Sequence, residues 1–332
     1  MNDTLNNENL DNLNNKEIFK LYSKKFKLNL FVNYEWYTEC YNNKTWEVIV
    51  IKKKNTIIAI MPFFLKKFLG FTIINLPNLH PWLELWISEK NLNVKKYNNI
   101  LNQIINELPK YDYLNINIYN LISPMQFYWN NFHVNYYQTC IIDNLCENKI
   151  SKILSNTKKQ NIKKAITEGV VLKKNYINSE DFYNFHLKTL KQDIFYSYSE
   201  ISKIFNYIIN RNKGFIISAY KKNELVANAL FIINNQECVL LITNNDEEKC
   251  KHALTYVIYK ALIISKRIGC KAFNFEGSMK KGVFNSYMAF GSNIKGYYNI
   301  KKINSNLLKI TIFFINLFKL PKLSLNQFFF RK

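Results

Sequence analysis

The second half of the chain reads as a regular succession of short strands and helices, each bounded by turn residues. In chain order the pattern predicts a strand at 169–174, helices at 180–191 and 199–212, strands at 215–220, 225–233 and 237–243, a helix at 252–267, a strand at 271–276, a short helix at 282–290 and a strand at 294–300. The three consecutive strands are separated only by Lys222–Asn223 and Asn234–Asn235, which indicates an antiparallel meander. An order of this kind restricts the chain to an α/β fold built on a mixed sheet.

The first half repeats this plan in reduced form. Its pattern predicts helices at 16–25 and 33–41, hairpin strands at 46–51 and 56–64, a strand at 72–76, a helix at 94–108, a strand at 113–118, a short helix at 124–132 and a closing strand at 135–142. Both halves end with an aromatic-rich short helix and a strand that carries two adjacent tyrosines, Tyr136–Tyr137 and Tyr297–Tyr298. We therefore expect two tandem copies of one fold, which 332 residues can accommodate.

The domain boundaries follow from this repeat. We expect domains at 16–146 and 147–303, preceded by a disordered, Asn-rich segment at 1–15 and followed by a basic, amphipathic tail at 304–332. The sequence "NLLKITIFFINLFKL" in this tail is interrupted by lysines and is too short to span a bilayer. It fits either a helix that docks on the protein or a helix that lies on a membrane surface.

The net charge of +22 suggests an anionic partner, but composition offers a simpler explanation. Asn, Lys, Ile, Phe and Tyr are abundant while Gly and Pro number only 8 and 6, a bias typical of an AT-rich genome. Lysine carries nearly all of the positive charge, and it lacks the planar fork with which arginine contacts bases and phosphates. General binding of nucleic acid is therefore not predicted.

The cysteines and the N-terminus bear on the compartment. The six cysteines form no C-x-x-C pair and no zinc-like spacing with the four histidines, so we expect reduced, mostly buried thiols and no metal. The N-terminus is polar and has no charged segment leading into an apolar one, so it does not resemble a signal peptide. These features predict a cytoplasmic protein.

The segment "NFEGSMKKGVFNSYMAFGSNIKGYYNI" carries a family resemblance. It resembles the signature of acetyltransferases of the GNAT superfamily of the cellulose-biosynthesis-associated kind, which are related to the Fem-type transferases that add amino acids to peptidoglycan. The stretches at 154–170 and 76–87 also resemble this family, so the resemblance covers nearly the whole chain. Asn274 stands where the family usually has Asp, and Met288 stands where it usually has Arg or Lys.

The resemblance implies both a fold and an activity. The fold is two tandem GNAT-like domains, each a mixed, mostly antiparallel twisted sheet flanked by helices. The activity is transfer of an acyl group, chiefly acetyl, from acetyl-CoA or another acyl-CoA to an amine of a small molecule or cell-envelope precursor, without a metal. Two alternatives stay open: a Fem-type transferase that uses aminoacyl-tRNA, and a non-catalytic scaffold with a degenerate site.

In this fold, the resemblance implies that the strands at 237–243 and 271–276 part from each other. Backbone groups of Leu241, Ile242 and Thr243 would then be available to bind the pantetheine arm of CoA. The helix that begins near His252 would direct its N–H groups at the pyrophosphate. The preceding loop contains no glycine, so the expected cofactor contacts are completed by Lys249, Lys251, His252 and Ala253. The alternative is an ordinary capped helix.

Candidate catalytic residues cluster after the strand at 271–276. Glu276 stands at its carboxyl end and is expected to be the base that deprotonates the acceptor amine, and Tyr287 or Tyr297 is expected to donate to the leaving sulfur. Alternatively, Glu276 caps the following short helix. Ser278 is expected either to cap that helix or to contact the substrate.

Two helices of the second half carry further candidates. In "NTKKQNIKKAITEG", Ile162, Ala165 and Ile166 form an apolar stripe and the lysines, Lys158 among them, are expected to be solvated. A basic helix surface of this kind could also meet a carrier such as tRNA. His186, in "FYNFHLKTL", is a candidate for the wall of the acceptor pocket, with a packed or surface histidine as the alternative.

Overall fold

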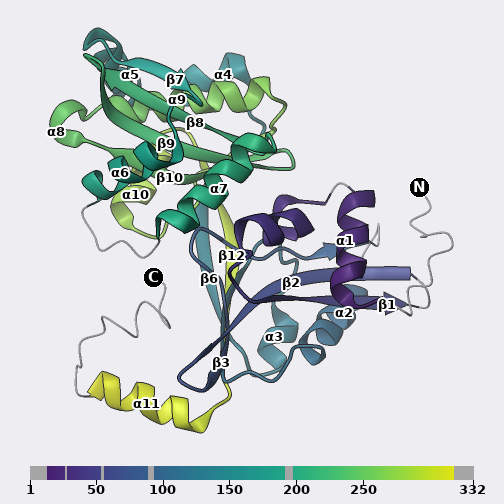
Figure 1. Ribbon diagram of the computed structural model, residues 1–332. Helices are drawn as coiled ribbons and strands as arrows, with labels where there is room; N and C mark the ends of the chain where they lie inside the picture. The colour runs from purple at the N-terminus through teal and green to yellow at the C-terminus, as the bar shows by residue number, and fades with distance from the viewer. Residues whose placement is uncertain (1–12, 27, 54–55, 89–92, 191–196, 318–332) are drawn as a thin grey trace. The chain divides into compact units, whose positions relative to one another are not determined.

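The structure is a computed structural model that describes residues 13–26, 28–53, 56–88, 93–190 and 197–317 (Figure 1). It divides into two units: unit 1 comprises 1–137 and 297–332, and unit 2 comprises 138–296. Most of the expected N-terminal segment 1–15 and the second half of the expected tail 304–332 lie outside the described residues. The first helix begins at Asn15, where the Asn14 side chain accepts from two backbone N–H groups in a capping box with Glu17.

Unit 1 is a mixed sheet in the order β1-β2-β3-β5-β12 with helices around it. Its elements are α1 (Asn15–Lys25), the 3₁₀ turn η2 (Leu30–Val32), the π-helical turn η3 (Trp36–Cys40), β1 (Trp46–Lys53), β2 (Thr56–Phe68), β3 (Phe71–Asn75), β4 (Trp86–Ile87), α2 (Val94–Asn106), β5 (Tyr113–Ile118), α3 (Met125–Trp129), the start of β6 (His133–Ile142), most of β12 (Asn293–Ile303) and α11 (Asn306–Leu317). The short β4 pairs with β2, outside the main path.

Unit 2 contains mixed-sheet strands in the order β6-β11-β10-β9-β8-β7. Its elements are α4 (Glu147–Ile153), α5 (Asn156–Thr167), β7 (Val171–Lys174), α6 (Ser179–Thr189), α7 (Tyr198–Asn210), β8 (Gly214–Lys221), β9 (Glu224–Asn234), β10 (Glu237–Asn245), α8 (Glu247–Cys250), α9 (Ala253–Arg267), β11 (Ala272–Asn274) and α10 (Lys281–Met288). The predicted meander is confirmed, because β8, β9 and β10 pair antiparallel in sequence.

The last strand of each half of the sequence enters the sheet of the other unit. From Gln138 onward β6 belongs to unit 2, where it pairs antiparallel with β11. From Tyr297 onward β12 belongs to unit 1, where it pairs antiparallel with β5. The two predicted tyrosine pairs consequently both lie in unit 1, with Tyr136 against Tyr298 at 5.9 Å and Tyr137 against Tyr297 at 5.8 Å between ring centroids.

Helices cover both faces of the unit 2 sheet (Figure 1). One face packs against α5 and α9 around a core that includes Phe215, Phe231 and Phe273. The opposite face carries α6 and α7, which contact β10 and β8 respectively. All six cysteines of the chain are free thiols, and only Cys146 among them is more than slightly exposed.

The junction between α10 and β12 depends on a glycine. Gly291 has a φ of +82°, and a Cβ at this position would lie 2.5 Å from the carbonyl oxygen of Ile153. Because both the left-handed conformation and the close approach exclude a side chain, the "Phe-Gly" pair of the predicted signature has a structural role here. Phe290, which precedes it, is fully buried and packs at 5.6 Å from Phe275.

Candidate functional site

In unit 2, β11 is much shorter than β10, so part of one edge of β10 has no strand beside it. β10 and β11 run parallel and pair only from Glu237 with Ala272 to Val239 with Asn274. β10 continues to Asn245, and no strand among the described residues pairs with that edge beyond Val239. Peptide groups of 240–245 therefore have no strand partner on that side, which is an arrangement that a ligand with amide groups can use.

A β-bulge lies at the start of this open edge. The register of β10 against β9 shifts between Leu240 and Ile242, so Leu241 is the extra residue. Bulges bend a strand and redirect its peptide groups, and they are common beside active sites. Leu241 and Thr243 are partly exposed while Ile242 is buried, and all three lie on the stretch of β10 that has no strand partner on one side.

The loop after β11 is fixed by a buried amide. Asn274 is fully buried, and its Oδ1 accepts from the Thr139 hydroxyl at 2.6 Å and from the backbone N–H of Glu276 at 2.9 Å. Its Nδ2 donates to Oε1 of Glu237 at 2.9 Å. An aspartate cannot donate this last bond and would place a second carboxylate beside Glu237. Asparagine therefore suits this position beside Glu237 better than aspartate would.

Ser278 closes the same loop. Its hydroxyl donates to the carbonyl oxygen of Glu276 at 2.6 Å and accepts from the backbone N–H of Cys140 at 3.1 Å, and the residue is 2% exposed. The N-cap of α10 is Lys280, whose side chain makes no capping hydrogen bond. The Ser278 hydroxyl is engaged within the loop and with β6 rather than with the start of α10, so the capping role expected for Ser278 is wrong.

Glu276 adopts an uncommon backbone conformation. Its φ is +54°, in the left-handed region that non-glycine residues seldom occupy, and the bonds to Asn274 and Ser278 hold it there. Backbone strain of this kind is concentrated at functional sites. The side chain is partly buried.

Tyr287 lies close to this carboxylate. Its ring stacks on Phe275 with centroids 4.7 Å apart. Burial, and then the negative charge of Glu276, raise the pKa of the phenol. Unit 2 thus brings together a carboxylate and a phenol that stays protonated at neutral pH. The third expected catalytic residue, Tyr297, belongs to unit 1, where its ring lies 6.0 Å from Trp82.

The segment before α9 differs from the predicted loop. Residues 247–250 form the helical turn α8, capped by the Asp246 side chain, where only a loop was expected before the helix that begins near His252. Lys249 is ion-paired with Glu224, and neighbouring Lys221 is ion-paired with Glu168 at 2.7 Å. These pairs reduce the positive charge that the segment offers to a pyrophosphate.

The remaining expected cofactor residues stand at the start of α9. Lys251 is exposed, His252 is the N-cap and makes no side-chain capping bond, and Ala253 is fully buried. Glu247 and Glu248 are exposed on the adjacent turn. An anion approaching the N-terminus of α9 would therefore meet carboxylates as well as the favourable helix dipole.

His186 is part of a buried polar row on the other face of the sheet. It is 1% exposed, and its Nδ1 is hydrogen-bonded to Oδ1 of Asn244. The Nδ2 of Asn244 donates in turn to Oδ1 of Asn228 at 2.6 Å. Because Oδ1 of Asn244 accepts, the proton lies on Nδ1 of His186 and Nε2 is the basic nitrogen. Burial lowers the pKa of this histidine, so the ring is neutral at neutral pH.

Lys158 was expected to be solvated, and this was wrong. It is 9% exposed, its Nζ donates to the hydroxyl of Ser286 at 2.9 Å, and the ammonium lies 4.3 Å from the centroid of Phe290. Burial lowers its pKa to about 8. The sequence contained the signal, because Lys158 precedes Ile162 by one helical turn and therefore shares its buried face.

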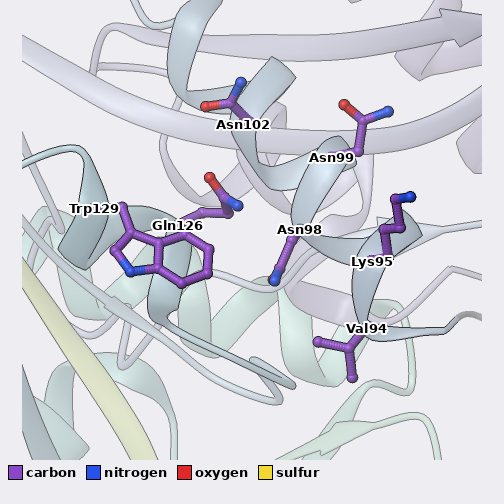
Figure 2. A pocket seen from close by; sticks show the side chains of 7 residues that line it. All are labelled: Val94, Lys95, Asn98, Asn99, Asn102, Gln126 and Trp129. Atoms are coloured by element: carbon purple, nitrogen blue, oxygen red, sulfur yellow. The ribbon is translucent and has the colours of Figure 1, made fainter.

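Unit 1 has an open groove of about 620 Å³ between α2 and α3 (Figure 2). Val94, Lys95, Asn98, Asn99 and Asn102 come from α2, and Gln126 and Trp129 come from α3. The lining supplies amide donors and acceptors, one lysine and an indole that is 58% exposed. It contains neither a carboxylate nor a histidine, so it offers no side-chain base for a reaction.

Two further findings concern metals and membranes. Within the described ranges, no group of three or more His, Cys, Asp or Glu side chains is arranged to hold a metal ion. None of the helices that the structure describes has the length and apolar character needed to cross a bilayer.

Comparisons with known proteins establish the fold. The sequence matches no protein-family model and no curated protein. FemX has a similar structure, with a TM-score of 0.63 at 10% identity over 90% of this chain and 98% of FemX. L-PGS from Bacillus licheniformis has a TM-score of 0.54 at 11% identity, over 90% of this chain and 94% of that chain.

A third similar structure is the C-terminal DUF2156 domain of a putative lysylphosphatidylglycerol synthetase from Agrobacterium fabrum, with a TM-score of 0.52 at 7% identity, over 90% of this chain and 96% of that chain. At such identities the similarity shows the fold alone. The predicted fold is confirmed: two tandem GNAT-like domains, each a mixed, mostly antiparallel twisted sheet flanked by helices.

Proposed function

We propose that the protein is an N-acyltransferase whose unit 2 transfers an acyl group from acyl-CoA, chiefly acetyl-CoA, to the amino group of a small molecule or cell-envelope precursor. The single observation that carries this proposal is the open edge of β10, which begins at the Leu241 bulge and lies next to the strand that leads to Glu276. The amide groups of a pantetheine arm can pair with peptide groups of 240–245 as a further strand would.

The chemistry requires a base for the amine and stabilisation of the leaving thiolate. The amine nitrogen attacks the thioester carbonyl, a C–N bond forms, and the C–S bond breaks. Glu276 accepts the proton of the amine, directly or through one water. Tyr287 donates a hydrogen bond to the leaving sulfur and keeps its own proton because its pKa is raised. The proton released by the amine ends on the CoA thiol or in solvent.

His186 is a second candidate base. Its ring is neutral and carries its proton on Nδ1, so Nε2 is the nitrogen that can be protonated. It belongs to the α6 and α7 side of the sheet, where the acceptor would be held. We assign contact with the acceptor to His186 and proton transfer to Glu276. Glu276 is preferred as the base because its backbone has a left-handed φ and its negative charge raises the pKa of Tyr287.

A second donor, an aminoacyl ester of tRNA, is favoured by a different observation. Lys249 is ion-paired with Glu224 and exposed carboxylates stand beside the N-terminus of α9, so pyrophosphate recognition there is weak. A donor that carries its acyl group on RNA does not need this contact. The fold similarity to FemX is compatible with such a donor, and the +22 charge permits it.

A transfer assay with both donors tests the proposal. The wild-type protein is incubated with an amine panel and either acetyl-CoA, with thiol release as the readout, or aminoacyl-tRNA, with amide formation as the readout. We expect turnover with acetyl-CoA that survives ribonuclease. Glu276→Gln should lower kcat/KM by about 100-fold or more with an unchanged melting temperature.

Glu180→Gln is the matched control, because Glu180 is exposed in the first turn of α6 and is not part of the site. It should leave kcat/KM unchanged. Turnover with aminoacyl-tRNA alone would replace the acyl-CoA donor with the second candidate. Absence of turnover with both donors, together with no heat of binding for CoA, would favour the scaffold alternative.

A further inference from the structure

The helix α11 docks on unit 1 through one face only. Leu308 is 1% exposed and packs with Ile73 and Tyr113, and Ile312 packs against the same cluster. These two residues are four positions apart and therefore lie on one side of the helix. The docking fixes the orientation of α11, so the residues on its opposite side point away from the unit 1 core.

That opposite side is apolar. Leu307, Ile310, Phe313 and Phe314 are 64, 53, 61 and 47% exposed, and their spacing places them on a single arc. Lys309 is the single charged residue of α11. A helix of this composition is ordinarily buried on all sides, whereas the described residues cover only the face of Leu308.

The turn between β2 and β3 adds a second apolar group to the same surface. Phe68 and Phe71 pack on the cluster that holds Leu308, and Leu69 between them is 77% exposed with a φ of +49°. In Figure 1 this turn lies beside α11. A leucine at a left-handed, exposed turn position contributes nothing to the local fold, where asparagine or glycine is the usual residue. We call Leu69, Leu307, Ile310, Phe313 and Phe314 the apolar rim.

We propose that the apolar rim docks the protein on an anionic lipid bilayer. Charge argues for this occupant over a second copy of the chain, because the segments that carry the rim are basic and contain no acidic residue. The segment 297–332 contains seven Lys and Arg residues and no acidic residue, and Lys66 and Lys67 precede the turn at Leu69. Two copies facing each other through this surface would bring these like charges together, whereas anionic headgroups would neutralise them.

The geometry suits an interfacial rather than a spanning helix. α11 extends over 12 residues, which is too short to cross the hydrocarbon core. One side of the helix is packed against unit 1 through Leu308 and Ile312. Its exposed phenylalanines would enter the boundary between headgroups and acyl chains, and the lysines would contact the phosphates. This inference does not depend on the acyl-transfer proposal.

Vesicle co-sedimentation of the full chain tests it. We expect the wild-type protein to bind vesicles that contain 30% phosphatidylglycerol at least 10-fold more tightly than pure phosphatidylcholine, with binding weakened by salt. The double variant Phe313→Ser/Phe314→Ser should lose binding at least 10-fold. The control Tyr128→Ser/Trp129→Ser removes two aromatics of comparable exposure from α3 and should bind as the wild type does.

Leu69→Asn separates binding from folding. Asparagine tolerates the left-handed φ better than leucine does, so the melting temperature should stay the same or rise while vesicle binding falls. Equal vesicle binding by the wild type and the Phe313/Phe314 double variant would overturn the proposal. So would a concentration-dependent dimer that the double variant abolishes, which would identify a second copy as the occupant.

Discussion

Replacing Asn274 by aspartate tests the polar network that holds the loop of Glu276. Asn274 is fully buried and donates from Nδ2 to Glu237 at 2.9 Å. The substitution removes a hydrogen bond to a charged group and places a second carboxylate against the first. Each effect is worth about 1.5–3 kcal/mol, so the free energy of unfolding at pH 7 should fall by roughly 3–6 kcal/mol.

The pH dependence gives this prediction a specific signature. Burial and the charge of Glu237 should raise the folded-state pKa of the new carboxyl above that of an unfolded aspartate. The folded protein then binds the proton more tightly than the unfolded chain, so the destabilisation is complete above the raised pKa and shrinks as pH falls through it. The variant should therefore approach the wild type in stability when the pH is lowered from 8 to 5.

Urea unfolding of wild type, Asn274→Asp and the exposed control Asn206→Asp at pH 5, 7 and 8 measures this difference. The control lies on the solvent side of α7 and should change stability by less than about 0.5 kcal/mol. A loss below about 1 kcal/mol for Asn274→Asp that does not vary with pH would refute the role assigned to this amide.

Two further predictions concern Lys158 and Gly291. The folded-state pKa of Lys158 is lowered to about 8, so between this pH and the usual lysine pKa the unfolded state binds more protons than the folded state. The unfolding free energy of the wild type, measured relative to that of Lys158→Met, should therefore rise by about 2–3 kcal/mol from pH 8 to 10.5. Stability profiles of the two proteins that run parallel over this pH range would contradict the burial of Lys158. Gly291→Ala should lower the free energy of unfolding, measured by chemical denaturation, by about 2–4 kcal/mol, because its Cβ would lie 2.5 Å from the Ile153 carbonyl oxygen. Gly282→Ala is the control: a Cβ there has no neighbour within 4 Å, so the variant should be as stable as the wild type or more stable. Equal effects of the two substitutions would contradict the role assigned to Gly291.

The order of elements could be predicted because it is encoded locally. Turn pairs such as Lys222–Asn223 and Asn234–Asn235 lie where the meander reverses, and helix caps such as Ser155 and Ser197 lie where α5 and α7 begin. The strand at 271–276 is shorter than predicted, because its alternating pattern extends to Glu276 while pairing ends at Asn274.

Other features depend on contacts that sequence periodicity does not report. Tyr297 was a candidate together with Glu276 because both stand in the segment 274–300 that carries the family resemblance, but β12 passes from unit 2 to unit 1 between Gly296 and Tyr297. The four-residue α8 is too short to show a helical period. The ion pair between Lys249 and Glu224 joins residues 25 positions apart, so the neutralisation of that lysine could not be anticipated.

The central claim is that an acyl donor lies along the open edge of β10. Amide hydrogen exchange of 240–245 measured with and without each donor, acetyl-CoA or aminoacyl-tRNA, tests it most directly. We predict slower exchange of these amides with one donor, while amides of β8 in the middle of the sheet stay unchanged. Unchanged exchange of 240–245 at saturating concentrations of both donors would contradict the claim.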